Sequence, residues 1–319
     1  MRQLWQRQGL LLETLPEHPL LTRAYVPTIL PLSENCWRIY FAGWDRDKRS
    51  RILAVDVDPT RSMRVVAEHF SPLVELGQIG AFDHSGTVPS CAIRVGTQVW
   101  LYYFGLHLRH EVRAAGAIGL VVSDDGLNFR RTHAGPVLGT GPLDPFLVGS
   151  MCVTSGATGY RMWYASGTTW LQAQADAQPD PACGIRLTRS ADGRFWSTDT
   201  TAVIDPSEPA EVGLARPWIV ASSGGNHLYY SRRGSDYREG GKSPYQMARV
   251  PMDPATGLVA GTGTPLEFQN PPQAGDFDSW MQAYSCVLPS GPDLIMVYNG
   301  NGFGKTGIGW ARLPGGALP

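Results

Sequence analysis

An acid, an imidazole and a hydroxyl stand side by side within residues 80–90. Asp83, His84 and Ser85 stand there between two glycines, and a short apolar segment follows them. Glycines give the backbone freedom to present a polar group, and a strand after the loop would hold that group in place. The same residue types form ordinary turns, so a turn without chemistry is the alternative. Ser85 lacks the Gly-x-Ser-x-Gly surroundings of a serine nucleophile, which leaves the acid and the imidazole as candidates.

Asp83 and Glu211 are the carboxylates that we expect to do acid–base chemistry. Glycosyl transfer to water needs one protonated and one ionised carboxyl group on either side of the scissile bond. We assign Asp83 as the base and Glu211 as the acid, because partial burial beside Trp218 would raise the pKa of Glu211. His84 could act as a base or orient a substrate hydroxyl, although neighbouring residues on a strand point to opposite faces. A turn cap, or for Glu211 an ion pair with Arg216, is the alternative.

Polar and aromatic residues elsewhere are candidates for substrate contacts. Arg216, which precedes a proline, would be a fixed cation for a carboxylate, a phosphate or a sugar hydroxyl. Residues 278, 280, 282 and 284 would share one face of a strand, and indoles at sugar sites stack on pyranose rings. Lys305 lies in a glycine-rich stretch that lacks the Walker pattern and is followed by a strand, so we expect a hairpin that closes over the site, with Lys305 or Asn301 touching the substrate. The expected substrate-binding residues are Trp44, Asp45, Asp144, Arg216, Trp218, Asp278, Trp280, Gln282, Tyr284 and Lys305.

Composition narrows the class of protein. The net charge is −1, so the sequence lacks the excess of basic residues that is typical of nucleic-acid-binding proteins. No apolar run approaches the ~20 residues of a membrane helix, and residues 1–8 lack the apolar core of a signal peptide, so we expect a cytoplasmic protein. Cys91, Cys152 and Cys286 lie in apolar runs, and none of the five cysteines forms a Cys-x-x-Cys pair. This predicts buried free thiols rather than a metal site, and we expect no cofactor.

The elements that must position these residues repeat along the chain. Five segments rich in Tyr, Trp and branched residues recur at intervals of about 60–67 residues, which predicts an internal repeat of strands. A shorter apolar strand precedes each segment and a third strand follows it, and a fourth strand follows in the first four repeats. The five segments are 37–43, 99–105, 160–167, 227–231 and 294–300.

The fifth repeat ends before a fourth strand, and residues 4–11 resemble the missing one. Four-stranded antiparallel sheets repeated around an axis form a β-propeller. We therefore predict an all-β fold with a single domain over residues 1–319, a five-bladed β-propeller closed by the N-terminal strand. In such a ring the loops that lead into the innermost strands meet at a central funnel. Asp83 in the second blade and Glu211 in the fourth would then face each other across it.

Several short motifs link the chain to a known family. They are 82–86, 160–164, 215–217, 299–307, and Asp45 together with 49–52. With these motifs the chain resembles the five-bladed β-propeller glycoside hydrolases of the arabinanase and invertase-like clans. It resembles more closely an uncharacterised bacterial branch often found among sugar and polysaccharide biosynthesis proteins. The resemblance covers nearly the whole chain and implies a sugar or sugar-derived small molecule as the substrate.

The sequence also departs from this family. Arabinanase-like enzymes place a carboxylate on each of the first three inner strands, whereas the first one here, 24–29, has none. The resemblance implies Arg at the position of Trp44, Glu at that of Trp280 and Pro at that of Ser285. Hydrolysis therefore does not carry over directly. A non-hydrolytic enzyme (a cyclase, lyase or isomerase) with an aromatic pocket is one alternative, and a sugar-binding module without chemistry is another.

Overall fold

The computed structural model describes residues 4–171, 178–206, 211–222 and 224–316. Within these ranges the chain is built from twenty β-strands, the short 3₁₀ helix η1 (Pro59–Arg61) and the four-residue helix α1 (Asn301–Gly304). The prediction of an all-β protein is confirmed. No helix in the described ranges is long and apolar enough to cross a membrane.

The strands form five groups of four antiparallel neighbours. The first two groups are β2 (Tyr25–Ser33), β3 (Cys36–Trp44), β4 (Ser50–Asp58) and β5 (Arg64–His69), and β6 (Gly86–Val95), β7 (Gln98–Leu108), β8 (Ala114–Ser123) and β9 (Arg130–Arg131). The next two are β10 (Leu147–Gly156), β11 (Gly159–Leu171), β12 (Asp180–Ser190) and β13 (Thr201–Ile204), and β14 (Gly213–Ser222), β15 (Gly225–Arg233), β16 (Gln246–Pro251) and β17 (Thr264–Pro265). The last group is β18 (Ala283–Ser290), β19 (Asp293–Asn299), β20 (Ile308–Leu313) and β1 (Gln6–Leu12).

The N-terminal strand is the outer strand of the last group. β1 pairs antiparallel with β20, from Gln6 opposite Arg312 to Leu12 opposite Ile308. Elsewhere, single parallel pairs join the first group to the second, at Ser50 and Gly86, and the third group to the fourth. The two ends of the chain therefore meet in one sheet.

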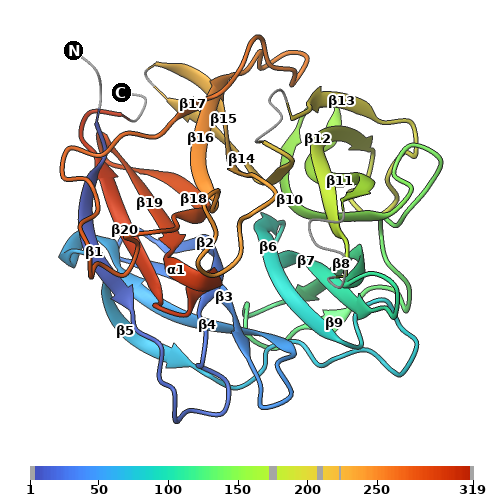
Figure 1. Ribbon diagram of the computed structural model, residues 1–319, viewed down its shortest axis with the longest axis horizontal. Coiled ribbons are helices and arrows are strands. Elements are labelled where there is room, and N and C mark those ends of the chain that lie inside the picture. Colours follow the sequence, from blue (N-terminus) through green and yellow to red (C-terminus); the bar gives the residue numbers. More distant parts are fainter. Residues whose placement is uncertain (1–3, 172–177, 207–210, 223, 317–319) are drawn as a thin grey trace.

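The first strands of the five groups lie nearest the middle of the molecule (Figure 1). β2 contacts β6, β6 contacts β10, β10 contacts β14, β14 contacts β18, and β18 contacts β2. Each of these strands has a shift in pairing register at a similar position. At that shift Val26, Ser150, Arg216 and Tyr284 adopt positive φ angles, between 46° and 60°. Such bulges bend a strand and re-aim its side chains, so each first strand changes direction where it leaves its preceding loop.

Aromatic side chains from the second strands fill the core. Trp100 and Trp163 are buried there, as the repeat pattern predicts. Trp218, expected from the sequence to bind substrate, is buried instead: it is 5% exposed and its Nε1 donates to the carbonyl oxygen of Val287. All five cysteines are free, and all but Cys36 are buried.

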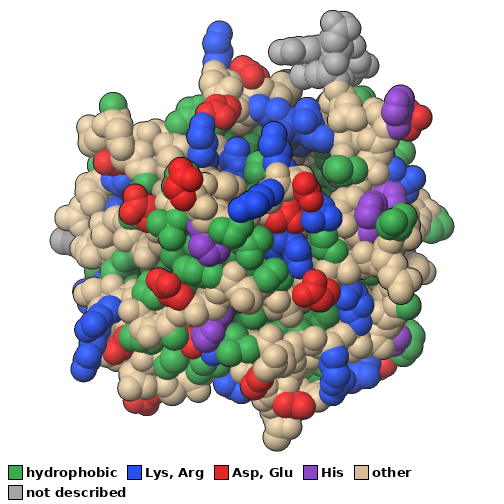
Figure 2. Space-filling model, turned by 90° about the horizontal axis from the view of Figure 1, so that it is seen from below, with side chains coloured by type: hydrophobic (Ala, Val, Ile, Leu, Met, Phe, Trp, Pro, Cys, Tyr) green, Lys and Arg blue, Asp and Glu red, His purple; other side chains and the backbone are tan. Residues whose placement is uncertain are grey.

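The surface carries charges of both signs. Figure 2 shows acidic and basic side chains intermingled on the face that it presents, with hydrophobic side chains between them. This distribution agrees with the net charge of −1.

Candidate functional site

Asp83 is held inside the second strand group. Its side chain is 1% exposed, and its Oδ2 accepts hydrogen bonds from the Tyr103 hydroxyl at 2.7 Å and from Arg131 Nη2 at 2.6 Å. Tyr103 lies on β7 and Arg131 on β9. Burial, together with the charge of Asp83, raises the pKa of Tyr103, which remains a neutral hydrogen-bond donor. The carboxylate is thus neutralised by its own group of strands.

The same contact recurs in two other strand groups. The Tyr164 hydroxyl donates to Asp144 at 2.9 Å, and the Tyr298 hydroxyl donates to Asp278 at 2.7 Å. In each case the tyrosine follows the aspartate by 20 residues, as it does for Asp83. All three carboxylates are buried. Each ties the loop before a first strand to the second strand of the same group.

An arginine accompanies each of these buried carboxylates. Arg131 serves Asp83, Arg186 lies 3.6 Å from Asp144, and Arg7 of β1 forms an ion pair with Asp278. A buried carboxylate needs such a partner because desolvation of an unpaired charge costs several kcal/mol. The predicted site residues Asp83, Asp144 and Asp278 therefore occupy equivalent structural positions.

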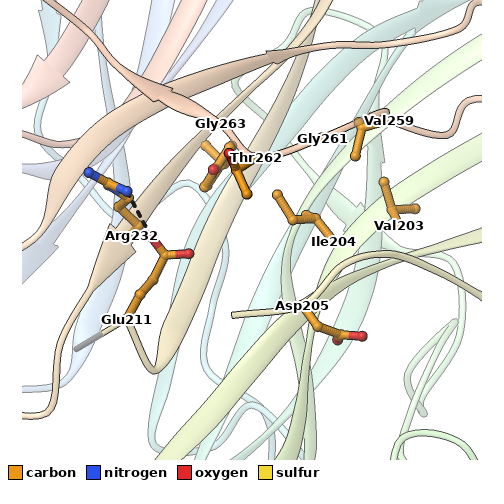
Figure 3. Close-up of a pocket in the computed structure, with 10 residues that line it drawn as sticks. Val203, Ile204, Asp205, Glu211, Arg232, Val259, Gly261, Thr262 and Gly263 are labelled. Atoms are coloured by element: carbon orange, nitrogen blue, oxygen red, sulfur yellow. Dashed lines mark hydrogen bonds and ion pairs between the residues drawn. The ribbon is translucent and has the colours of Figure 1, made fainter. Parts of the chain in front are cut away.

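Glu211 lies in the fourth strand group, at the border of two cavities. It is 8% exposed and accepts a hydrogen bond from Arg232 Nη1 at 2.9 Å. Figure 3 shows this pair on one side of a cavity of about 240 Å³, with Val203 and Ile204 on the other side. A second cavity of about 230 Å³ is also lined by Glu211 and Arg232. Burial, then the charge of Glu211, raises the pKa of Tyr230 to about 12.

The structure does not bring Asp83 and Glu211 together through any described contact. In the described ranges, each carboxylate is bonded within its own strand group, and no cavity is lined by both. The partner of Glu211 is Arg232 rather than Arg216, which was the alternative considered from the sequence. Their assignment as an acid–base pair stays a prediction.

Arg216 lies in the interior and is 0% exposed. Its Nη2 donates to the carbonyl oxygen of Pro27 at 2.7 Å and to Thr28 Oγ1 at 2.8 Å, while Nη1 bonds to Ser90. The guanidinium also packs 5.0 Å from the ring of Trp218. Arg216 therefore links β14 to β2 and β6, and a substrate could reach it only if the core opened. The sequence motif indicates a fixed cation, and the structure uses it as a cross-link between first strands.

His84 lies next to a second imidazole. Its ring centre is 5.0 Å from that of His107, and Ser85 Oγ is 3.3 Å from its Nδ1. His107 Nδ1 lies 3.1 Å from the carbonyl oxygen of Ala81. His84 is partly exposed whereas Asp83 is buried, so the two neighbours face different surroundings.

The expectation that residues 278–284 share one strand face is wrong, because β18 begins only at Ala283. The residues before it form turns. Trp280 Nε1 donates to the carbonyl oxygen of Gly241 at 3.0 Å, and Gln282 donates to the carbonyl oxygen of Asp278. Tyr284, at the bulge of β18, is the member of this segment that reaches other aromatic rings.

Five aromatic residues line the region where loops lead into the first strands; we call them the mouth cluster. They are Tyr25, Trp44, Tyr245, Tyr284 and Phe303. Trp44 Nε1 donates to the Tyr25 hydroxyl at 3.2 Å. The Tyr245 ring lies 5.1 Å from Tyr284 and 6.0 Å from Phe303. Tyr284 packs against the apolar residues on both sides and so connects the two halves.

Sequence reasoning found Trp44 and Tyr284 of this cluster and missed the other three. Tyr25 is the first residue of β2 and follows Ala24, just as Tyr284 follows Ala283 at the start of β18. Phe303 stands among the glycines of the 299–307 stretch. Burial raises the pKa of Tyr25 and of Tyr284, so both phenols remain neutral donors.

Asp45 and Lys305 are engaged in ion pairs. Asp45 bonds to Arg49 at 2.9 Å and lies 3.8 Å from Arg51, and Lys305 bonds to Glu239 at 2.9 Å. Lys305 follows the short helix α1, not the predicted hairpin.

The glycines of this stretch allow close packing against β2. A Cβ atom at Gly304 would collide with the carbonyl oxygen of Ala24, and the backbone of Gly304 has a φ of +73°. The Ala24 amide donates to the Gly304 carbonyl oxygen at 2.9 Å. The glycine-rich motif therefore serves backbone contact.

Asp180 is a residue that sequence reasoning missed. It starts β12 and accepts hydrogen bonds from Tyr237 at 3.0 Å and from Arg238 at 2.5 Å, and Arg113 lies 3.4 Å away. These partners come from the second and fourth strand groups. Burial alone would raise the pKa of Asp180, but the hydrogen bonds and charge of Arg238 outweigh it and hold that pKa below its usual range. Among the described residues, no group of three His, Cys, Asp or Glu side chains could hold a metal ion.

Comparison with known proteins finds relatives both by sequence and by structure. No protein-family profile matches the chain. It is 30% identical over 288 residues to the uncharacterized protein Rv1502 of Mycobacterium tuberculosis strain H37Rv, covering 89% of this chain and 91% of that protein.

Solved structures of glycoside hydrolases share the fold. One of them belongs to a study of the GH130 family of mannoside phosphorylases, which contains glycoside hydrolases that target β-1,2 mannosidic linkages in Candida mannan. It aligns with a TM-score of 0.70 at 11% identity, over 100% of this chain and 97% of that protein. A Bombyx mori GH32 β-fructofuranosidase in complex with sucrose has a TM-score of 0.63 at 12% identity and covers 90% of this chain and 59% of its own. The fold is therefore that of the propeller-type glycoside hydrolases.

Proposed function

Since the chain belongs to the family of the mycobacterial protein Rv1502 and has the fold of propeller-type glycoside hydrolases, we propose that it is a glycosidase-like, carbohydrate-active enzyme. Its substrate would be a sugar or a sugar-derived small molecule. We also propose that the five strand groups are the five blades of one domain, closed by β1. The contacts from β2 around to β18 and back, and the pairing of β1 with β20, support this arrangement.

The observation that carries the proposal is the mouth cluster. Aromatic faces stack on the apolar faces of pyranose rings, and phenol and indole groups add hydrogen bonds at the edges. Tyr25, Trp44, Tyr245, Tyr284 and Phe303 offer both, and they lie where the loops of the first, fourth and fifth strand groups converge.

We propose Asp83 as the base and Glu211 as the acid, with His84 as a further group for proton transfer. Two observations support a chemical role. Asp83 Oδ1 is buried and has no hydrogen-bond partner among the described residues, so this carboxylate oxygen remains available to a ligand. Glu211 borders two cavities that a small solute could enter. Hydrolysis would further require the two carboxyl groups to flank one sugar.

A second function, non-hydrolytic chemistry on a sugar-derived intermediate, is favoured by a specific observation. Both proposed carboxylates are bonded to an arginine, Asp83 to Arg131 and Glu211 to Arg232. Both carboxylates therefore accept hydrogen bonds from a cation, whereas a general acid must donate a proton to the leaving group.

The two functions are separated by a hydrolysis assay. Wild type, Asp83→Asn and Glu211→Gln are compared on a panel of aryl glycosides, with release of the aryl alcohol as the readout. Loss of a wild-type activity in both variants supports the glycosidase. Asp56→Asn is the matched control, because Asp56 is also a buried carboxylate bonded to an arginine, Arg38, but belongs to no proposed site.

Absence of hydrolysis across the panel would reject the glycosidase. Sugar binding is then measured by intrinsic tryptophan fluorescence in wild type and in Trp44→Ala. Binding that is lost in Trp44→Ala would retain the mouth cluster as the sugar site and move the proposal to the non-hydrolytic function. Sugar binding unaffected by Trp44→Ala would reject the mouth cluster.

A further inference from the structure

We propose that the sugar bound at the mouth cluster carries a negatively charged group, a carboxylate or a phosphate, and that Arg23 binds this group. The inference rests on the proposed function, since it assumes a sugar at the mouth cluster, and it adds the charge class of that sugar.

Arg23 stands at the mouth cluster without a carboxylate partner. Its guanidinium carbon lies 4.3 Å from the ring centre of Trp44, and its Nη1 would lie 3.7 Å from a Cβ at Gly302. α1, which contains Gly302, lies beside β2 (Figure 1). Among the described residues Arg23 forms no ion pair, and its Nη1 is shielded from solvent without a hydrogen-bond acceptor. Arginine planes stacked on an indole keep their edge donors free for a planar or tetrahedral anion.

The acidic residue nearest to Arg23 is already engaged. Glu239 interacts electrostatically with Arg23, but its carboxylate is hydrogen-bonded to Lys305 at 2.9 Å. These three side chains together carry one excess positive charge. Burial lowers the pKa of Arg23, which reflects the cost of keeping this cation partly desolvated.

A second arginine without a carboxylate lies on the other side of the cluster. Arg233 is 5% exposed and packs 4.0 Å from the ring of Tyr237. Its donors go to the Tyr245 hydroxyl and to the carbonyl oxygens of Gly234 and Pro181. All of these acceptors are neutral, and no acidic residue in the described ranges forms an ion pair with Arg233.

The region around the mouth cluster is thus more basic than the chain as a whole. Asp180 pairs with both Arg113 and Arg238, whereas neither Arg23 nor Arg233 has a carboxylate partner in the part of the chain that the structure describes. The charged residues linked to Arg23, or to Arg233 through Tyr237, are Arg23, Arg113, Arg233, Arg238, Lys305, Asp180 and Glu239. Five of them are basic and two are acidic, while the complete chain has a net charge of −1. A partly desolvated site with excess positive charge attracts an anionic ligand and rejects a cationic one.

The test compares matched neutral and anionic sugars. Glucose, galactose and mannose are each titrated as the free sugar, as the uronate and as the 6-phosphate, at constant ionic strength, with calorimetry and tryptophan fluorescence as readouts. Wild type is expected to bind at least one anionic form roughly 10- to 100-fold more tightly than its neutral parent, the range typical of hydrogen bonds to a charged group. The uronate and phosphate arms identify which anion is preferred.

Arg23→Met should abolish this preference, and Arg23→Lys should retain part of it. Arg194→Met is the matched control, because Arg194 stacks 4.9 Å from Trp100 in a turn that belongs to no proposed site. Thermal unfolding shows that each variant is folded. Equal affinity for neutral and anionic sugars, or a preference that survives Arg23→Met, would overturn the inference and leave the proposed function standing. Binding of no sugar in any form would reject both.

Discussion

Removal of Arg131 tests whether the buried carboxylate of Asp83 is neutralised as the geometry indicates. Asp83 is 1% exposed, and Arg131 is the only cation hydrogen-bonded to it in the described residues. Arg131→Met keeps the aliphatic bulk but leaves the carboxylate with the Tyr103 hydroxyl as its hydrogen-bond donor. Breaking a buried ion pair by removing one partner costs about 3–5 kcal/mol. Because the Arg131 side chain is 28% exposed, water can reach the site, and we expect a loss near the lower end of that range.

The assay is a double-mutant cycle followed by urea unfolding. Arg131→Met is made in the wild type and in Asp83→Asn, where no negative charge remains to be balanced. We expect a loss of about 3 kcal/mol in the wild type and below about 1 kcal/mol in Asp83→Asn. Equal losses in the two backgrounds would refute the reasoning, because they would mean that Arg131 stabilises the fold through packing and not through the charge of Asp83.

Three further outcomes are expected. Asp180 has a lowered pKa in the folded protein, so its ion pairs contribute stability above its ordinary pKa of about 3.9, and this contribution is lost as the pH falls through the lower folded value. Melting temperatures measured from pH 6 down to pH 2 should therefore fall less steeply in Asp180→Asn than in wild type. Parallel curves for the two proteins would contradict this expectation. Gly304→Ala should destabilise by more than about 2 kcal/mol because the new Cβ meets the Ala24 carbonyl, whereas Gly275→Ala, with φ +95° and open space around it, should cost only about 1 kcal/mol in urea unfolding. Titration of the native protein with a thiol reagent should modify Cys36 alone, since the other four cysteines are buried. The rate should rise with pH as the thiolate forms, and this rise should lie at higher pH than for an ordinary thiol because burial raises the pKa of Cys36. Rapid modification of more than one thiol would show that the core opens.

The strand pattern could be predicted from the sequence because it depends on local alternation. The aromatic segments at 37–43 and 99–105 fall within β3 and β7, and residues 4–11 include most of β1. Tyr, Trp and branched residues at alternate positions leave few options other than a half-buried or fully buried strand.

The surroundings of the candidate residues could not be predicted in the same way. Asp83 was identified by its type, but its partner Arg131 lies 48 residues away on β9. Only the assembled group of strands brings the two side chains within hydrogen-bond distance. The sequence did contain one pattern that could have indicated these contacts: in three repeats an aspartate precedes a tyrosine by 20 residues.

Arg216 illustrates a second limit of the sequence. An arginine before a proline in a loop-like stretch suggests a ligand contact, and its acceptors, Thr28 and the carbonyl oxygens of Pro27 and Ser90, lie on two other first strands. Two of its four acceptor atoms, the carbonyl oxygens of Pro27 and Ser90, belong to the backbone and cannot be inferred from residue types. Only the arrangement of β2, β6 and β14 in space, which lets the Arg216 side chain reach the other two strands, could reveal a structural cation at this position.

The pairing of β1 with β20 has a consequence for synthesis on the ribosome. β1 emerges first, yet its partner ends at Leu313, near the other end of the chain. At a synthesis rate of about 5–20 residues per second, roughly 15–60 s pass between the emergence of β1 and that of β20. During this time it is an unpaired strand that could associate with a neighbouring nascent chain. Its length of seven residues, its register shifts and the polar residues Gln6, Arg7 and Gln8 make such mispairing less favourable while the last sheet is incomplete.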